Sequence, residues 1–272
     1  RLPLVYRSEY DISFFGLQHL HRFDSKKWGR VVSMLCGDKE LSVNGVGLYE
    51  PEVVSTEDVL VRHLDPGYLE KIQNSPERIS NILEIYPARY FSMSTLESLV
   101  LRPFRYQVGG TLLATSLALE HGAAVNIGGG FHHACLEEGG GFCVYPDITL
   151  AILEARRKHN VTGNVLIIDL DAHQGNGHER DFIEDDKVTI VDFFSHPNYP
   201  GFGLEHPVVK RIDKSFPVSS STSEAEYLDR LDQVLGDLIQ SAFALLVDNA
   251  GAGIVSGVPV GRFHISEEAI VK

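Results

Sequence analysis

Four short runs of β-branched and aliphatic residues alternate with helical patterns along the last two-thirds of the chain, and this alternation constrains the fold most. The runs cover residues 123–127, 164–169, 187–191 and 244–247. Helical spacing of apolar residues occupies 98–121, 148–158 and 225–238. Runs that are apolar on both faces and separated by helices are typical of a parallel sheet covered on both sides. The sequence therefore predicts an α/β fold with a central parallel sheet.

The length and the absence of linkers favour one domain. A chain of 272 residues fits one large α/β domain or two small ones. No internal repeat is visible, and no Pro/Gly/Ser-rich stretch divides the sequence. We therefore predict a single domain over residues 1–272.

Charge and cysteine content exclude several classes of protein. Acidic side chains outnumber basic ones by 37 to 24, which gives a formal net charge of −13. Such a balance argues against direct nucleic-acid binding, which needs a basic face, and is compatible with basic peptide partners. No stretch approaches the ~18 uninterrupted apolar residues of a membrane span, so no membrane association is expected. Three cysteines without a CxxC pair argue against a disulfide framework and favour a reducing compartment.

Three of the predicted strands end in polar or glycine-rich loops. These loops cover residues 128–133, 169–176 and 249–253. Ligands of open parallel sheets bind beyond the carboxyl ends of the strands. We therefore expect the three loops to cluster at one edge of the sheet and to form the functional site.

The second loop begins with the pattern Asp169-Leu-Asp171-Ala-His173. Residues two apart on a strand share a face, and adjacent carboxylates repel unless a cation or a proton lies between them. Asp171 and His173 form an oxygen–nitrogen pair suited to a zinc-type ion. The alternative is that these residues cap the helix that follows.

Two adjacent histidines, His132 and His133, follow three consecutive glycines. Adjacent side chains point to different sides, so one imidazole can face a carboxylate. A carboxylate partner fixes the tautomer of the ring and raises its basicity, as a general base requires. The alternative is one buried, hydrogen-bonded histidine beside one exposed histidine.

The third loop also matches the first part of a dinucleotide-binding fingerprint, through Gly251 and Gly253. Ser256 stands in place of the last glycine, Pro259 follows soon after, and no helical pattern begins there. We therefore regard dinucleotide binding as the weaker interpretation of this loop.

Taken together, the motifs resemble those of the zinc-dependent histone deacetylases. They are Asn-Ile-Gly-Gly-Gly-Phe-His-His at 126–133, Gly-Gly-Gly-Phe-Cys at 139–143, Asp-Ile at 147–148 and Ile-Asp-Leu-Asp-Ala-His-Gln-Gly-Asn-Gly-His-Glu-Arg-Asp at 168–181. The resemblance extends from about Val5 to Lys272, and Gln174 and Asn176 are most similar to the class IV branch.

The resemblance implies an arginase/deacetylase-like three-layer domain and a role for each matching residue. Asp171 and His173 match two of three zinc ligands. His132 and His133 match the pair that activates water and protonates the leaving amine. The remaining matches are Asp169 and Asn176 behind the two histidines, and Gly141, Phe142 and Tyr199 in the tunnel for the acyl-lysine substrate.

Two departures from the family pattern bear on activity. Gly253 occupies the position of the third zinc ligand, an aspartate in the family, and Asp248 lies too early on the strand to replace it. The chain also stops at Lys272, before the loop that carries the tyrosine of the oxyanion site. Because it begins at Arg1 rather than Met, we expect a fragment or a C-terminally truncated domain.

The resemblance therefore implies zinc-dependent hydrolysis of acyl-lysine in histone tails or other proteins, located in the nucleus, the cytoplasm or both. Gly253 predicts one weakly bound Zn²⁺ and impaired turnover. The alternative is a catalytically inactive module that keeps the deacetylase fold and binds acyl-lysine or a protein partner.

Overall fold

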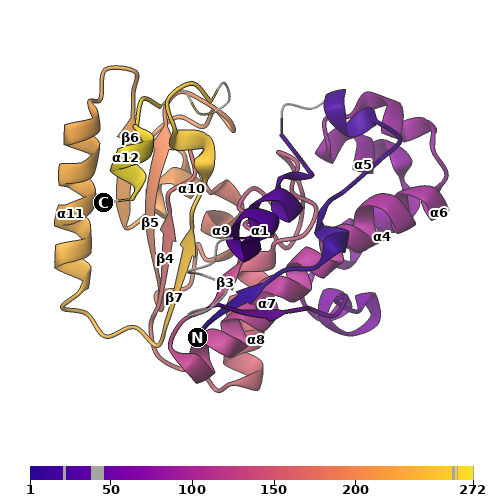
Figure 1. The fold of residues 1–272 in the computed structure, drawn as a ribbon, viewed down its shortest axis with the longest axis horizontal. Helices are drawn as coiled ribbons and strands as arrows, with labels where there is room; N and C mark the ends of the chain where they lie inside the picture. The colour runs from indigo at the N-terminus through magenta and orange to yellow at the C-terminus, as the bar shows by residue number, and fades with distance from the viewer. Residues whose placement is uncertain (21–22, 38–45, 259–260, 262, 272) are drawn as a thin grey trace. The chain divides into compact units, whose positions relative to one another are not determined.

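The computed structural model describes residues 1–20, 23–37, 46–258, 261 and 263–271. It consists of two compact units, Arg1–Asn160 and Val161–Lys272. Each unit contains one parallel sheet with helices, so the predicted α/β class with parallel strands is confirmed (Figure 1). Among the residues described, no helix is both long and apolar enough to cross a bilayer.

The first unit combines a three-stranded parallel sheet, in the order β2-β1-β3, with a set of helices. Its elements are β1 (Leu2–Val5), η1 (Ser8–Tyr10), η2 (Leu17–Leu20), α1 (Lys27–Gly37), β2 (Val46–Tyr49), η3 (Thr56–Leu60), α3 (Val61–His63), α4 (Pro66–Asn74), α5 (Pro76–Ile82), η4 (Tyr86–Tyr90), α6 (Met93–Leu96), η5 (Glu97–Leu101), α7 (Arg102–His121), β3 (Val125–Asn126) and α8 (Asp147–Lys158).

Helix α7 is the longest element of this unit and leads directly to the loop that bears the two histidines. It follows the π-helical segment η5, and the two together cover the helix predicted over 98–121. It ends at Gly122, whose φ of 91° places it in the left-handed conformation that glycine adopts without a steric penalty. The chain then enters β3, which pairs with β1 in parallel. The turn at Gly122 therefore ends the helix and directs the chain into β3, beside β1.

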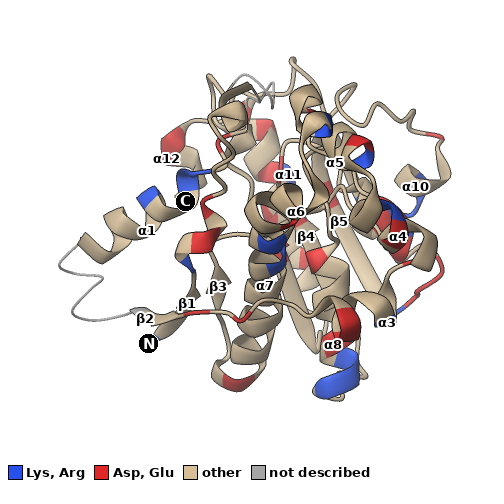
Figure 2. Cartoon of the chain, turned by 90° about the vertical axis from the view of Figure 1, so that its right-hand side faces the viewer, with Lys and Arg blue, Asp and Glu red and all other residues tan. Residues whose placement is uncertain are grey.

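Helix α8 carries a buried carboxylate that contacts one arginine, one lysine and one histidine. Glu154 accepts hydrogen bonds from Arg157 at 2.7 and 2.8 Å, lies 2.8 Å from Lys158 Nζ, and is 2.8 Å from His63 Nε2 on α3. Figure 2 shows the basic residues gathered at the C-terminal end of this helix. The Arg157 guanidinium holds the pKa of Glu154 well below its usual range, with Lys158 and His63 acting against the effect of burial. This network ties α3 to α8.

We expect Glu154→Gln to lower the free energy of unfolding at pH 7 by about 2 kcal/mol, because charge-assisted hydrogen bonds are lost. The folded-state pKa is depressed, so the contribution is present above the ordinary glutamate pKa and is lost as the pH falls. The difference from wild type should therefore shrink in urea titrations below about pH 4. The control is the exposed Glu120→Gln change, whose free energy of unfolding should stay within ~0.5 kcal/mol of wild type both at pH 7 and below about pH 4. Equal effects of the two substitutions at pH 7 would contradict this role of Glu154.

The second unit contains a four-stranded parallel sheet in the order β6-β5-β4-β7. In Figure 1, α11 runs along one face of this sheet. Its elements are β4 (Val165–Asp169), α9 (Asn176–Asp181), β5 (Val188–Ser195), α10 (Pro207–Lys210), β6 (Lys214–Val218), α11 (Glu224–Leu238), β7 (Leu245–Asn249), η6 (Ala252–Ile254) and α12 (Glu267–Ile270).

The register of the second sheet sets the position of two of the predicted loops. Strand β4 is buried along its whole length, and both its neighbours run parallel to it. Asp169 at the end of β4 is paired in register with Asn249 at the end of β7. The loops 169–176 and 249–253 therefore leave the same edge of one sheet, as predicted for these two. The loop 128–133 follows β3 of the other sheet, so its clustering with them stays a prediction.

Candidate active site

The loop over residues 128–133 follows β3 in the first unit, and its glycines are required by crowding as well as by conformation. Gly129 and Gly130 have φ values of 78° and 73°, which L side chains rarely adopt. A Cβ at Gly129 would lie 2.3 Å from Asp147 Oδ2, and one at Gly128 would lie 2.5 Å from the Tyr10 ring. Gly128 and Gly129 thus let the backbone pass against groups that leave no room for a side chain, and Gly129 and Gly130 supply the left-handed conformation.

Asp147, the first residue of α8, holds this loop from one side. Its Oδ1 accepts from the Phe131 N–H at 2.7 Å, and its Oδ2 accepts from the Gly130 N–H at 2.9 Å and the Thr111 hydroxyl at 2.5 Å. Burial raises the pKa of this fully buried carboxyl, and the donated hydrogen bonds oppose the increase. Asp147 stands in the Asp-Ile motif at 147–148, but its role was not predicted from the sequence; an acidic residue inside an otherwise apolar run was the available signal.

Gln107 on α7 holds the same loop from the other side. Its Oε1 accepts from the Gly129 N–H at 3.0 Å, and its Nε2 donates to the Tyr10 carbonyl at 3.1 Å. Asn126 adds a further link, because it donates to the Gln107 carbonyl and accepts from the Tyr10 hydroxyl at 2.8 Å. The path of the loop is therefore fixed by a network that includes Tyr10 and Asn126, two residues 116 positions apart in the sequence.

The two histidines at the end of this loop are both buried, with exposed fractions of 5% for His132 and 6% for His133. Their ring centroids lie 4.0 Å apart with an interplanar angle of 41°. The alternative of one buried and one exposed histidine is therefore wrong. Burial of two polar rings side by side is costly unless each is hydrogen-bonded, which favours a functional reason for the pair.

Phe142 lies in the apolar core of the first unit. Its ring is 4.8 Å from that of Phe23 and 5.8 Å from that of Phe104, and its N–H donates to the Ile82 carbonyl at 2.9 Å. Both Gly141 and Phe142 have positive φ values, 51° and 66°. A phenylalanine with positive φ is uncommon, and this strained conformation persists only where the surrounding structure enforces it. Its place in a substrate tunnel stays a prediction.

In the second unit, Asp169 forms the base of the loop that follows β4. Its Oδ1 accepts from the Asp171 N–H at 3.0 Å and from Asn249 Nδ2 at 2.9 Å, and its Oδ2 lies 2.9 Å from His178 Nε2. Asp169 is completely buried and His178 is 1% exposed. The side chain thus connects the loops after β4 and β7 to the first turn of α9.

Asp171 and His173, the two predicted metal ligands, lie together on this loop. Asp171 Oδ1 accepts from the His173 N–H at 2.9 Å and lies 3.1 Å from His173 Nδ1. Helix α9 begins at Asn176, and its N-cap residue Gly175 offers no side chain. The alternative that the aspartates cap the helix is therefore wrong.

The family's zinc site is only partly matched by the residues described. Tetrahedral zinc with bonds of ~2.0–2.1 Å places neighbouring ligand atoms about 3.3 Å apart, close to the separation of Asp171 and His173. Within the described ranges, however, no three His, Cys, Asp or Glu side chains are grouped to hold a metal. A catalytic zinc needs three protein ligands. The residues present do not complete such a site.

Position 253 explains the gap in the ligand set. An ideal Cβ built on Gly253 would lie 4.0 Å from Asp171 Oδ2 and 3.1 Å from the Ala172 Cβ. A side chain here would thus begin beside the Asp171 carboxylate. At Gly251, by contrast, a Cβ would lie only 2.1 Å from Asp171 Oδ2, so that position has no room for a side chain.

Two further predicted residues lie near this loop. The Tyr199 ring is partly exposed, and its centroid is 6.3 Å from that of His173 at an interplanar angle of 79°. Asn176 is buried at the start of α9. The predicted partnership of Asp169 and Asn176 with the two histidines joins the two units and stays a prediction.

Sequence reasoning missed three buried polar residues behind the loop: His178 and Glu179 on α9, and Asp192 on β5. Asp192 interrupts an otherwise apolar strand, which was the one local signal of its importance. His178 and Glu179 stand within the family motif at 168–181, but no role was predicted for either.

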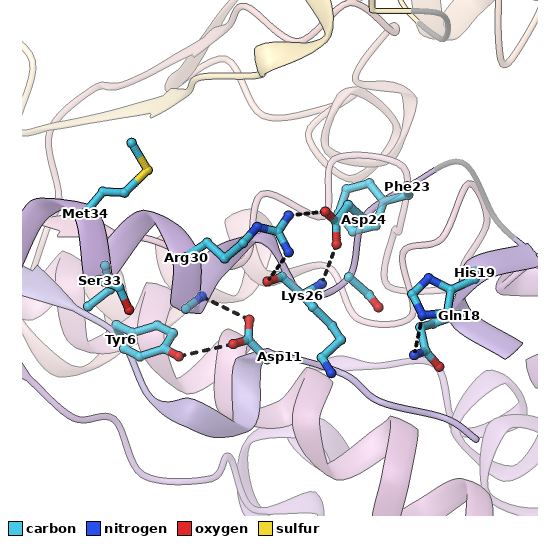
Figure 3. A pocket seen from close by; sticks show the side chains of 13 residues that line it. Tyr6, Asp11, Gln18, His19, Phe23, Asp24, Lys26, Arg30, Ser33 and Met34 are labelled. Carbon is cyan, nitrogen blue, oxygen red and sulfur yellow. Dashed lines mark hydrogen bonds and ion pairs between the residues drawn. The ribbon is translucent and has the colours of Figure 1, made fainter. Parts of the chain in front are cut away.

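The pocket in Figure 3, with a volume of about 1110 Å³, lies in the first unit and contains none of the predicted site residues. Several of its polar groups hydrogen-bond to each other. Asp11 accepts from the Tyr6 hydroxyl at 3.4 Å and the Gly29 N–H at 3.0 Å, and Asp24 accepts from Arg30. These contacts hold α1 against the start of the chain, so we do not place the functional site there.

Comparison with known proteins identifies the family. A family profile described as "Histone deacetylase domain" matches residues 21–272. The chain belongs to the histone deacetylase family. This domain is 42% identical to "Histone deacetylase 2" of Arabidopsis thaliana over 99% of the chain and 68% of that protein. It is 29% identical to "Histone deacetylase 8" of Xenopus laevis over 82% of the chain and 70% of that protein.

A solved structure, "Crystal Structure of HDA15 HD domain", matches the fold of this histone deacetylase domain. The TM-score is 0.75, and the match covers 99% of the chain and 77% of that structure. At 15% sequence identity, this likeness shows the fold alone. The predicted deacetylase-like fold is thereby confirmed.

Proposed function

We propose that this histone deacetylase domain acts on acylated lysine in histone tails or other basic protein segments, and that it belongs to the class IV branch. The observation that carries the proposal is the Asp171–His173 pair, held at the end of β4 by the buried Asp169. Family members are zinc-dependent hydrolases, and the pair has the donor types and spacing that zinc prefers. Gln174 and Asn176 support the assignment to the branch.

In this proposal the paired histidines move protons during amide hydrolysis. One imidazole removes a proton from the attacking water, and the other protonates the departing lysine amine. Their burial excludes bulk water and strengthens the interaction of each ring with charge. Because Gly253 leaves the ligand set incomplete, we expect slow turnover in the chain as it stands.

A second function is favoured by the same glycine. If zinc is not retained, the domain is expected to bind acyl-lysine or a protein partner without hydrolysing it. The preserved histidines and aspartates would then keep the shape of a binding site.

Hydrolysis and binding are separated by one pair of assays. Turnover of an acetyl-lysine peptide and of a longer acyl-lysine peptide is measured with added Zn²⁺ and after chelation, for wild type and His133→Ala. The enzyme hypothesis predicts weak, chelator-sensitive turnover that falls at least ~100-fold in His133→Ala. Peptide binding without any turnover supports the binding module. If the peptide is neither bound nor hydrolysed, both hypotheses are rejected.

The acidity of the chain predicts how a basic substrate binds. Because the net charge is −13, a lysine-rich acyl peptide should be attracted over about 8 Å at physiological ionic strength. We expect its dissociation constant to rise several-fold between 50 and 500 mM NaCl, measured by fluorescence anisotropy. An acyl-lysine peptide of zero net charge is the control and should show little dependence on salt. Identical salt responses would mean that the acidic surface does not contribute to recognition.

A further inference from the structure

Arg211 follows α10, which packs against α9, and its guanidinium group donates four hydrogen bonds. Nε donates to the Phe182 carbonyl at 2.6 Å, and Nη2 donates to the carbonyls of Asp185 at 3.2 Å and Val188 at 2.5 Å. Nη1 donates to Asp213 Oδ2 at 2.9 Å. A guanidinium group has five N–H donors, and only 10% of this side chain is exposed. Arg211 therefore acts inside the fold of the second unit.

The three carbonyl groups belong to one connection, between α9 and β5, and lie three residues apart in sequence. The Asp185 N–H donates to the Phe182 carbonyl and the Val188 N–H donates to the Asp185 carbonyl, both at 3.1 Å, so two tight turns follow each other. Phe182 caps the C-terminal end of α9, and Val188 begins β5. Each carbonyl oxygen can accept a second hydrogen bond. Arg211 supplies that donor to all three oxygens.

A cation suits this position better than a neutral donor. Backbone carbonyl oxygens carry partial negative charge, so three of them around one point favour a positive charge there. Arginine carries a fixed charge on a planar fork of donors, which can meet several acceptors at once. The ion pair with Asp213 is a weaker explanation, because that carboxylate is 46% exposed and exposed ion pairs contribute little.

Helix α9 connects these carbonyls to the candidate site. His178 in its first turn lies 2.9 Å from the Asp169 carboxylate, which also accepts the Asp171 N–H. Arg211 holds the other end of the helix through the Phe182 carbonyl. A helix of six residues is not stable by itself in water, so the position of α9 depends on contacts such as these.

We propose that Arg211 is a positioning residue whose guanidinium acts as a built-in cation: it gathers the three carbonyls and fixes the C-terminal end of α9. Through α9 it keeps His178 against Asp169, at the base of the loop that carries the predicted metal ligands. The consequence for acyl-lysine chemistry rests on the proposed function, whereas the fixing of α9 does not.

The first test is urea unfolding of the whole chain in 150 mM choline chloride, followed by circular dichroism. The unfolding constant of Arg211→Ala should exceed that of wild type at least ~100-fold, because three carbonyls lose a charged donor. Replacement of 50 mM choline by guanidinium or potassium, which are small enough to enter the vacated space, should lower it about fivefold more than in wild type. If neither ion has this additional effect, the built-in cation is overturned.

Two further variants separate the carbonyl contacts from the ion pair. Asp213→Asn removes the charge of the exposed partner and should raise the unfolding constant no more than about fivefold. Arg211→Lys keeps the charge without the fork of donors, so its stability should lie between wild type and Arg211→Ala. The proposal is wrong if Asp213→Asn is as destabilising as Arg211→Ala, or if Arg211→Lys is no more stable than Arg211→Ala. These comparisons hold even where Arg211→Ala is unfolded in every salt.

The second test asks whether the effect is located at α9. Hydrogen exchange measured by mass spectrometry should be at least ~10-fold faster over residues 176–182 in Arg211→Lys than in wild type. Exchange over α11, residues 224–238, is the internal control and should change less. Equal acceleration of both segments, or none at α9, would overturn the positioning role. Activity is not measured in either test, so failure of the proposed function would leave these results intact.

Discussion

Gly253→Asp should tighten zinc binding by at least ~100-fold. Loss of a residue that only supports a metal ligand typically costs 10–100-fold in affinity, so gain of a direct anionic ligand should have at least that effect. The side chain would begin 4.0 Å from Asp171 Oδ2, beside the Asp171–His173 pair. The measurement is a zinc titration in competition with a chromophoric chelator, with metal content determined after dialysis.

The control for this substitution is Gly253→Ala. Both changes place a Cβ 3.1 Å from that of Ala172, so both impose the same crowding, but alanine adds no ligand. Zinc affinity should be unchanged in Gly253→Ala. Tight, stoichiometric zinc in the unmodified chain would show that another group already supplies the third ligand. In that case the proposal of slow turnover would fail.

Asp147→Ala should be the most destabilising single substitution considered for the first unit. It removes the acceptor of the Gly130 and Phe131 N–H groups and of the Thr111 hydroxyl. Each buried donor left without a partner costs about 1–3 kcal/mol, so we expect a loss of about 3–9 kcal/mol in the free energy of unfolding. Urea unfolding followed by circular dichroism and by fluorescence of the single tryptophan, Trp28, measures this loss.

Two variants test whether the loss arises at the loop. Asp147→Asn keeps one acceptor oxygen and should lose less stability than Asp147→Ala. Asp58→Ala removes an exposed carboxylate with an i,i+4 partner on Arg62, and should cost no more than ~0.5 kcal/mol. If Asp147→Ala is as stable as Asp58→Ala, the carboxylate does not anchor the histidine loop.

The parallel-sheet architecture was predictable because the apolar runs are locally strong. The run at 164–169 corresponds to β4, the run at 187–191 to the first part of β5, and the run at 244–247 to β7, each to within a few residues. Strand β6 was not predicted, because it is partly exposed and contains Pro217, which belongs at a sheet edge. Strand β1 is only four residues long and is recognisable only through its partners.

The candidate site was predictable where chemistry shows in the local pattern. The pairs Asp171–His173 and His132–His133 were found because metal-ligand and proton-transfer residues stand close in sequence. The residues that hold these loops were not predictable, because Asp147 and Asp192 accept hydrogen bonds from backbone N–H groups 16 and 17 residues away. Partnerships of that kind depend on tertiary packing, and no spacing rule reveals them.

The network around the three glycines has a consequence for selectivity among acyl groups. A loop that is held by Asp147, Gln107 and Asn126, and in which Gly128 and Gly129 have no free space beside them, has little room to change its path. Such a loop is preorganised, so under the proposed function it presents the two imidazoles to a substrate with little rearrangement. The proposed function then requires that other walls of the site discriminate between short and long acyl chains, and engineering of chain-length preference should leave residues 128–133 untouched.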